Sequence, residues 1–109
     1  MPGYSLKSLS SEIDFDVEDF IPLLELFIDS TELNLIEISD GVKKSDKGIL
    51  SFNIHNIKGA AMNLGLEYIS GIMEHMSMLN KNGSFADIKD SMDDCKAEII
   101  ELRQVLEKK

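Results

Sequence analysis

The chain of 109 residues is poor in the residues that disulfide frameworks, sheets and membrane spans require. Its one cysteine cannot form a disulfide within the chain, so nothing in the composition points to an oxidising compartment. Two prolines, no tryptophan and few clusters of β-branched residues favour helices over sheet. No apolar run approaches the roughly 20 residues of a membrane span, and the N-terminus has no signal-peptide core. We therefore expect a soluble, cytoplasmic, helical domain.

Positive charge is also scarce. Eleven Lys and Arg residues stand against 20 Asp and Glu residues, which gives a net charge of −9. Nucleic acids and anionic membranes both need a positive surface, so neither is an expected partner. A group of acidic residues near the C-terminus resembles a metal site at first, but helical spacing places it on a solvated face without the loop that calcium requires. These residues are Asp87, Asp90, Asp93 and Asp94.

Apolar residues recur at steps of three and four, which is typical of amphipathic helices. This pattern predicts four helices, at residues 17–44, from 45 or 46 to 64, 66–79 and 85–106. Pro22 either kinks the first helix or moves its start to about Ile21. Gly65 is expected to end the second helix in a left-handed conformation, and Asn80 to Gly83 are expected to form a loop. The core residues predicted in the first helix are Phe20, Leu23, Leu24, Phe27, Ile28, Thr31, Leu35, Ile38 and Val42.

Four amphipathic helices with short connections predict an all-α fold, an antiparallel four-helix bundle. Residues 16–109 are expected to form this bundle. Residues 1–15 are expected to be a partly ordered leader, with room for a short N-terminal helix because Leu6, Leu9 and Ile13 share one helical face. Cys95 falls on a core step of the last helix and is expected to act as a small buried hydrophobic residue.

His55 lies in the middle of the second predicted helix, roughly 140° around the helix axis from its core stripe. The histidine should therefore face solvent, with Lys58 beside it. A glycine inside a helix costs about 1 kcal/mol relative to alanine, and close approach by another surface would explain Gly59. Both residues also have non-functional explanations. His55 would then be a solvated surface histidine, as we expect for His75, and Gly59 would only allow tight packing between helices. The residues predicted on the same outward face are Gly48, Phe52, Gly59 and Met62.

The segment His55-Asn56-Ile57-Lys58-Gly59, with Gly65 after five more residues, resembles the motif His-x-x-Lys-Gly-x5-Gly of histidine-containing phosphotransfer (HPt) domains. The resemblance extends from about Phe20 to Leu106. The same signature occurs in the phosphorylated domain at the N-terminus of chemotaxis-type histidine kinases, so that domain is an alternative within the resemblance. A non-catalytic helical module that binds a partner without phosphate transfer is a further alternative.

The resemblance implies that His55 accepts a phosphoryl group and passes it to or from an aspartate of a response-regulator receiver domain. Lys58 would stabilise the phosphate and Gly59 would leave room for it. A histidine kinase is the second implied partner. We expect no autonomous kinase activity because the chain has no nucleotide-binding motif, and no cofactor, since Mg²⁺ would belong to the receiver. A monomer is expected. The residues expected to dock the partner are Phe52, Met62, Gly48, Ser77 and Lys81.

One position departs from the family pattern. Members often carry Glu or Gln 22 residues after the histidine, where the side chain can bond the imidazole, and here that residue is Ser77. Glu74, one turn earlier, is a substitute that projects differently. Lys81 could add positive charge near the site. The group that orients His55 therefore stays open at the level of the sequence.

Overall fold

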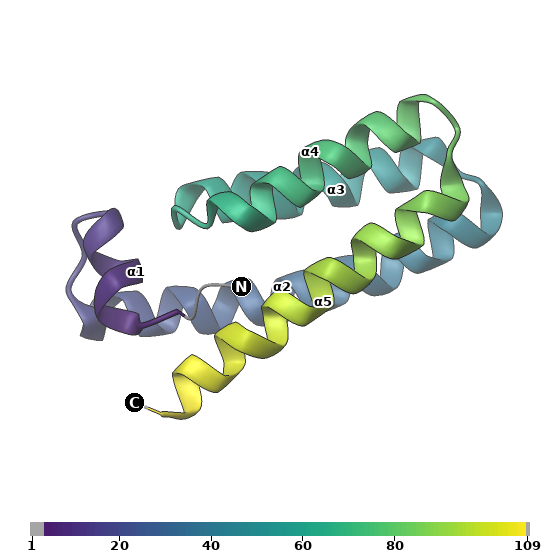
Figure 1. Cartoon of the computed structure of the whole chain (residues 1–109). Helices are drawn as coiled ribbons and strands as arrows, with labels where there is room; N and C mark the ends of the chain where they lie inside the picture. The colour runs from purple at the N-terminus through teal and green to yellow at the C-terminus, as the bar shows by residue number, and fades with distance from the viewer. Residues whose placement is uncertain (1–3, 109) are drawn as a thin grey trace.

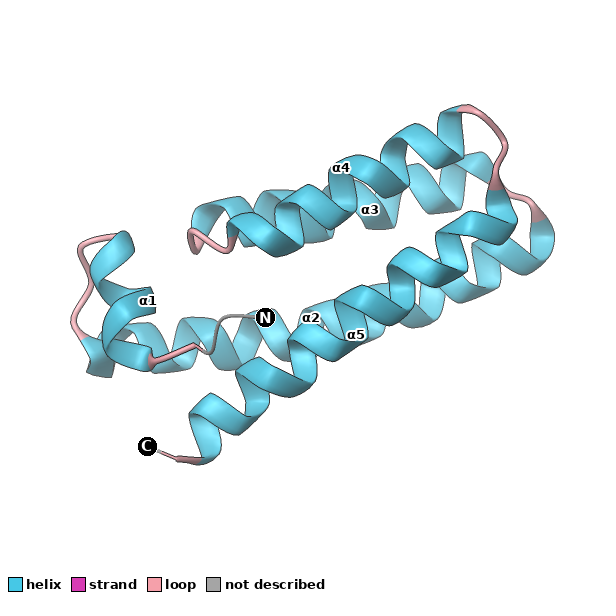
Figure 2. Cartoon of the chain, viewed as in Figure 1, coloured by secondary structure: helices cyan, strands magenta, loops and turns pink. Residues whose placement is uncertain are grey.

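The computed structural model describes residues 4–108 and consists, within them, of five helices with no strand (Figures 1 and 2). The helices in chain order are α1 (Leu6–Glu12), α2 (Val17–Lys44), α3 (Lys47–Asn63), α4 (Glu67–Lys81) and α5 (Phe85–Glu107). Helices α2 to α5 form a rod and α1 lies at one end of it, and the whole measures 41 × 22 × 21 Å. The predicted all-α bundle is confirmed, including its short N-terminal helix. Residues 1–3 of the predicted leader and residue 109 lie outside the described residues.

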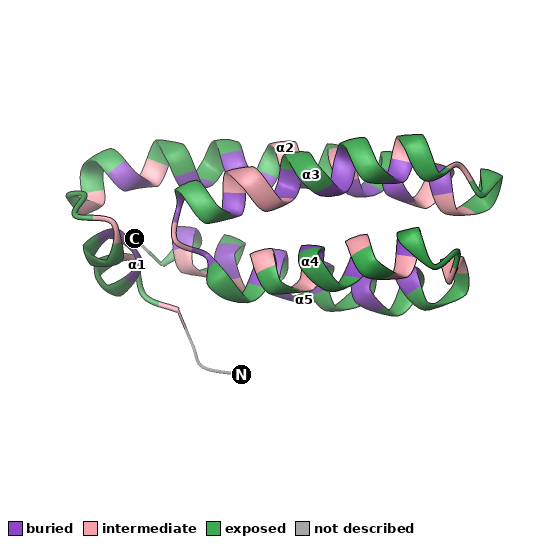
Figure 3. Cartoon of the chain, turned by 90° about the horizontal axis from the view of Figure 1, so that it is seen from above, coloured by how far each residue is buried: buried purple, intermediate pink, exposed green. Residues whose placement is uncertain are grey.

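Each long helix packs against its neighbours in the chain, and α5 closes the bundle against α2. Figure 1 shows α3 and α4 lying together above α2 and α5. The buried stripes of the four helices meet along the axis of the rod, as the inward-facing purple segments of Figure 3 show. Cys95 is buried in this core, as predicted. Leu23 is exposed, which corrects its predicted place in the core, because the neighbouring Leu24 occupies the buried position.

Three helix boundaries resolve or correct the sequence predictions. Helix α2 begins at Val17, not near Ile21, and includes Pro22. Pro22 has no N–H, so the Glu18 carbonyl lacks its hydrogen bond within the helix. Both residues are exposed, and water can therefore reach this carbonyl. Asp46 caps α3, since its carboxylate accepts a hydrogen bond of 3.1 Å from the Ile49 N–H. Helix α4 continues through Asn80, which was predicted in a loop, because the Asn80 amide is buried and donates to the Lys47 carbonyl at 3.1 Å.

The turn between α3 and α4 fixes the two helices relative to each other. Gly65 has a φ of +69°, the left-handed conformation predicted for it, and the next N–H, of Leu66, returns to the Ala61 carbonyl at 2.9 Å. A side chain at Gly65 would also meet Ile13 at 3.1 Å. Leu9 of α1 is buried against the same end of the bundle. The leader therefore covers this end and packs closely on the turn.

Candidate functional site

Helix α3 presents His55 to solvent. Its apolar residues step around one side of the helix and are buried, namely Leu50, Ile54, Ile57 and Ala61. The next residue after Ile54 therefore points outward, and His55 is exposed. The predicted orientation of the histidine is confirmed. A ring on the outside of a rigid helix can be reached by another protein.

The surface around His55 is apolar and open. Phe52, one turn before the histidine, is 66% exposed, and Met62, two turns after it, is 61% exposed. Gly48 is exposed and Gly59 is half-buried. A methyl group built on Gly59 meets nothing within 4 Å in the described part of the molecule. Tight packing between helices therefore does not explain this glycine, and the space above it is free.

Lys58 is bound to helix α4. Its Nζ donates a hydrogen bond to Oε2 of Glu74 and forms a salt bridge with that carboxylate. This hydrogen bond first, and the charge of Lys58 second, lower the pKa of Glu74 below its ordinary value. The pair lies at the surface, with side chains 34% and 62% exposed for Lys58 and Glu74. The sequence offered Glu74 as a partner for His55, and the structure pairs it with the lysine instead.

Ser77 and Lys81 lie on α4, the helix that faces α3. Ser77 is half-buried, and neither its hydroxyl nor the His55 ring makes a side-chain hydrogen bond among residues 4–108. Lys81 is exposed, and its carbonyl accepts a hydrogen bond of 3.2 Å from Lys47 Nζ. The charge of Lys81 also lowers the pKa of Glu74, less than Lys58 does. The imidazole is therefore exposed on α3, and no hydrogen bond to a side chain among residues 4–108 fixes its orientation.

The other chemically capable side chains do not gather at a second site. His75 is exposed, and so are Asp87, Asp90, Asp93 and Asp94. No group of three or more His, Cys, Asp or Glu residues suited to a metal ion occurs in the part of the chain that the structure describes. Burial raises the pKa of the Cys95 thiol to about 12, so this thiol is protonated and unreactive. Within residues 4–108, no helix is both long and apolar enough to cross a membrane.

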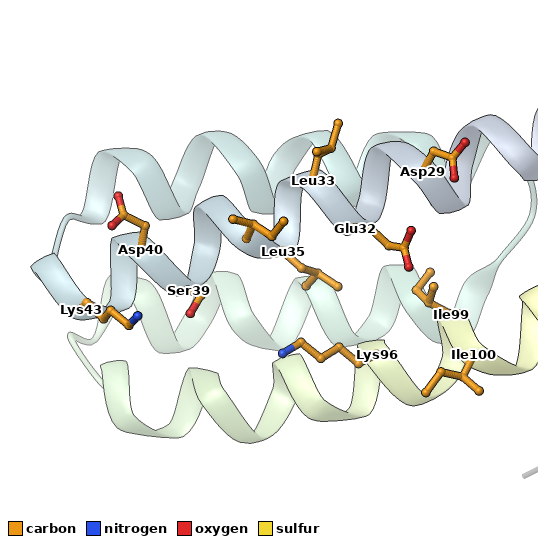
Figure 4. Close-up of a pocket in the computed structure, with 11 residues that line it drawn as sticks. Asp29, Glu32, Leu33, Leu35, Ser39, Asp40, Lys43, Lys96, Ile99 and Ile100 are labelled. Atoms are coloured by element: carbon orange, nitrogen blue, oxygen red, sulfur yellow. The ribbon is translucent and has the colours of Figure 1, made fainter.

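A wide groove lies away from His55, between α2 and α5 (Figure 4). It has a volume of about 1010 Å³ and is lined by Leu33 and Ile36 of α2 and by Lys96 and Ile100 of α5, among others. Glu32, one of the lining residues, accepts a hydrogen bond of 2.7 Å from Nη2 of Arg103. A second groove, between α2 and α3, joins Leu33 and Ile36 to Gly48 and Phe52. The apolar surface beside His55 therefore continues onto α2.

Sequence reasoning missed two features. The exposed Leu26, Leu33 and Ile36 lie on the solvent side of α2, where a core stripe gives no signal. Glu98 is only 1% exposed, and the Tyr4 hydroxyl donates a hydrogen bond to its Oε1. The step of three from Cys95 to Glu98 along the buried stripe of α5 was a signal for this burial. Its partner was not predictable, because 94 residues separate Tyr4 from Glu98.

The fold and the site define a class of protein, a helical bundle with an exposed imidazole and a neighbouring ammonium group on one helix. A family model described as the Hpt domain matches residues 22–105. That match covers most of the sequence, so the chain belongs to the Hpt domain family. Its function is accordingly histidine phosphotransfer in a two-component phosphorelay, and Hpt domains in general interact with kinases and response regulators.

Comparison with solved structures agrees on the fold. The crystal structure of histidine-containing phosphotransfer protein B (HptB) from Pseudomonas aeruginosa PAO1 superposes with a TM-score of 0.76 over 94% of this chain and 87% of that one. The two sequences are 18% identical, so the likeness concerns the fold. No curated protein matches the sequence closely enough to count as a relative.

Proposed function

We propose that His55 is the residue that carries the phosphoryl group. The observation that supports this most directly is its exposure in the middle of α3, with open space above Gly59 and Lys58 one turn away. Residues three apart on a helix are neighbours on its surface, so the Lys58 ammonium can reach a phosphate on the His55 ring. The family motif coincides with these same residues.

The proposed chemistry is an in-line displacement at phosphorus. Nε2 of the neutral imidazole attacks the aspartyl phosphate of a receiver domain, and an N–P bond forms as the P–O bond to the aspartate breaks. The carboxylate leaves with the electron pair, and the positive charge on the ring is removed when Nδ1 releases its proton to solvent. The reverse sequence returns the phosphoryl group to an aspartate.

Within this mechanism, Lys58 places positive charge beside the transferred group, and Gly59 leaves room for it and for the approaching loop of the receiver. Phosphoryl transfer depends mainly on positioning and charge stabilisation, which these residues supply without an acid–base pair. The chain needs no cofactor of its own in this proposal, because Mg²⁺ acts at the acidic pocket of the receiver.

The proposed partners are a response-regulator receiver domain and a histidine kinase, which meet the chain as a monomer in the cytoplasm. The docking surface is centred on His55, and its apolar part supplies contact area while α4 frames one side. Its residues are Phe52, Met62, Gly48, Ser77 and Lys81.

The test is incubation with a phosphorylated receiver domain. We expect an acid-labile, alkali-stable label on the wild-type chain that is absent from the His55→Gln variant. The matched control is His75→Gln, which removes the other histidine of the chain and should be labelled like the wild type. Label that survives in His55→Gln would refute the assignment of His55 as the residue that carries the phosphoryl group. Receiver binding without any label would favour the non-catalytic interaction module, for which the exposed Phe52 and Met62 already provide a surface.

A further inference from the structure

Lys58, the lysine that the proposed function assigns to the phosphate, already has a partner in the structure. The carboxylate of Glu74 accepts its hydrogen bond across the interface between α3 and α4. A phosphoryl group on His55 would lie one helical turn from the same ammonium group. Two anions, one fixed and one transferred, therefore share a single cation.

The strength of the existing pair decides whether it can be exchanged. Ion pairs between exposed side chains contribute little to stability, because solvent and salt screen them. Glu74 is 62% exposed, so its hold on Lys58 is weak. A phosphoryl group carries nearly two negative charges and three acceptor oxygens, and it competes well with one exposed carboxylate.

We propose that Glu74 is a positioning residue that acts through Lys58: it holds the ammonium group beside His55 in the resting chain and competes with the phosphoryl group for it afterwards. This inference rests on the proposed role of His55. The competition weakens the hold of the carrier on its phosphate, which suits a group that must be passed on. A carrier that bound the phosphoryl group too tightly would retain it.

The test measures the equilibrium between the phosphorylated receiver and the phosphorylated chain. We expect Glu74→Gln to shift this equilibrium towards phosphohistidine by about twofold to fivefold, the range typical of exposed charge pairs. The shift should shrink as salt is added. Glu67→Gln is the matched control, since it removes an exposed carboxylate two turns earlier on α4, and it should leave the equilibrium unchanged.

A double-mutant cycle separates action through Lys58 from the mere removal of a nearby negative charge. In a Lys58→Met background, the shift caused by Glu74→Gln should fall to near zero. An equal shift in both backgrounds, no shift in either, or a shift towards the receiver would each overturn the proposal. These outcomes differ from failure of the proposed function, in which the wild-type chain carries no label on His55 at all.

Discussion

Replacing Gly59 is expected to make the protein more stable and less active at once. Glycine inside a helix costs about 1 kcal/mol relative to alanine, and beyond the adjoining backbone of α3 a methyl group at this position meets nothing within 4 Å among residues 4–108. Gly59→Ala should therefore raise the free energy of unfolding by about 1 kcal/mol and the melting temperature by about 4 °C. Gly59→Leu should also fold, because leucine is a good helix former and the space is open.

The same side chains should obstruct the partner. If a receiver loop closes over Gly59, extra methyl and methylene groups must be accommodated in a packed interface. Overpacking of this kind typically costs about 1–3 kcal/mol, so Gly59→Leu should weaken receiver binding and slow transfer by about fivefold or more. Gly59→Ala should show a smaller loss in the same direction.

Gly71 provides the matched control. It lies inside α4, and a methyl group there also meets nothing within 4 Å in the described structure, but it lines a groove with Tyr68 and His75 instead of the face around His55. Gly71→Ala and Gly71→Leu should gain similar stability without any change in transfer. Melting followed by circular dichroism and transfer followed by stopped flow give the two readouts. Wild-type transfer by Gly59→Leu, or a fall in its melting temperature, would refute the reasoning.

Three further variants test the surface and the leader. Lys58→Ala should slow transfer about tenfold in a stopped-flow assay with an unchanged melting curve, and equal rates would remove its role. Phe52→Ala should weaken receiver binding about fivefold by titration calorimetry, whereas Ile100→Ala, in the groove between α2 and α5, should not. Tyr4→Phe leaves the buried Glu98 carboxylate without its hydrogen bond and should cost about 1–3 kcal/mol in urea unfolding. Burial first, and the hydrogen bond to Glu98 second, raise the pKa of Tyr4 above its ordinary value of 10.0. The stability that Tyr4 contributes through this bond is therefore complete below pH 10.0 and is lost as the pH rises through the raised pKa. A Tyr4→Phe variant with the same stability and pH profile as the wild type would contradict this.

The long helices were predictable because burial on one face leaves a regular record in the sequence. The stripe of α3 placed Ile54 and Ile57 inside and His55 outside, and the structure agrees. Gly65 was predictable for a similar reason, since its position after the stripe requires a left-handed turn. Local rules of this kind need only the order of the residues.

The contacts between helices were not predictable from the same rules. Gly41 of α2 is buried, and a side chain there would meet Leu50 of α3 at 3.1 Å, a close approach that periodicity within α2 does not indicate. Asn80 extends α4 because of a hydrogen bond to Lys47, 33 residues earlier. Glu74 pairs with Lys58 because of the register between α3 and α4. Such pairings depend on how helices are placed, which periodicity within one helix does not specify.

The most direct test of the account is to identify the ring nitrogen that becomes phosphorylated. The chain has two histidines, so ¹⁵N labelling of histidine gives NMR signals from only two imidazole rings. After treatment with a phosphorylated receiver domain, we predict that the ring signals of His55 shift and that its Nε2 couples to phosphorus, while both nitrogens of His75 stay unchanged. Coupling to phosphorus at His75, or at neither ring while the chain carries phosphate, would contradict the account.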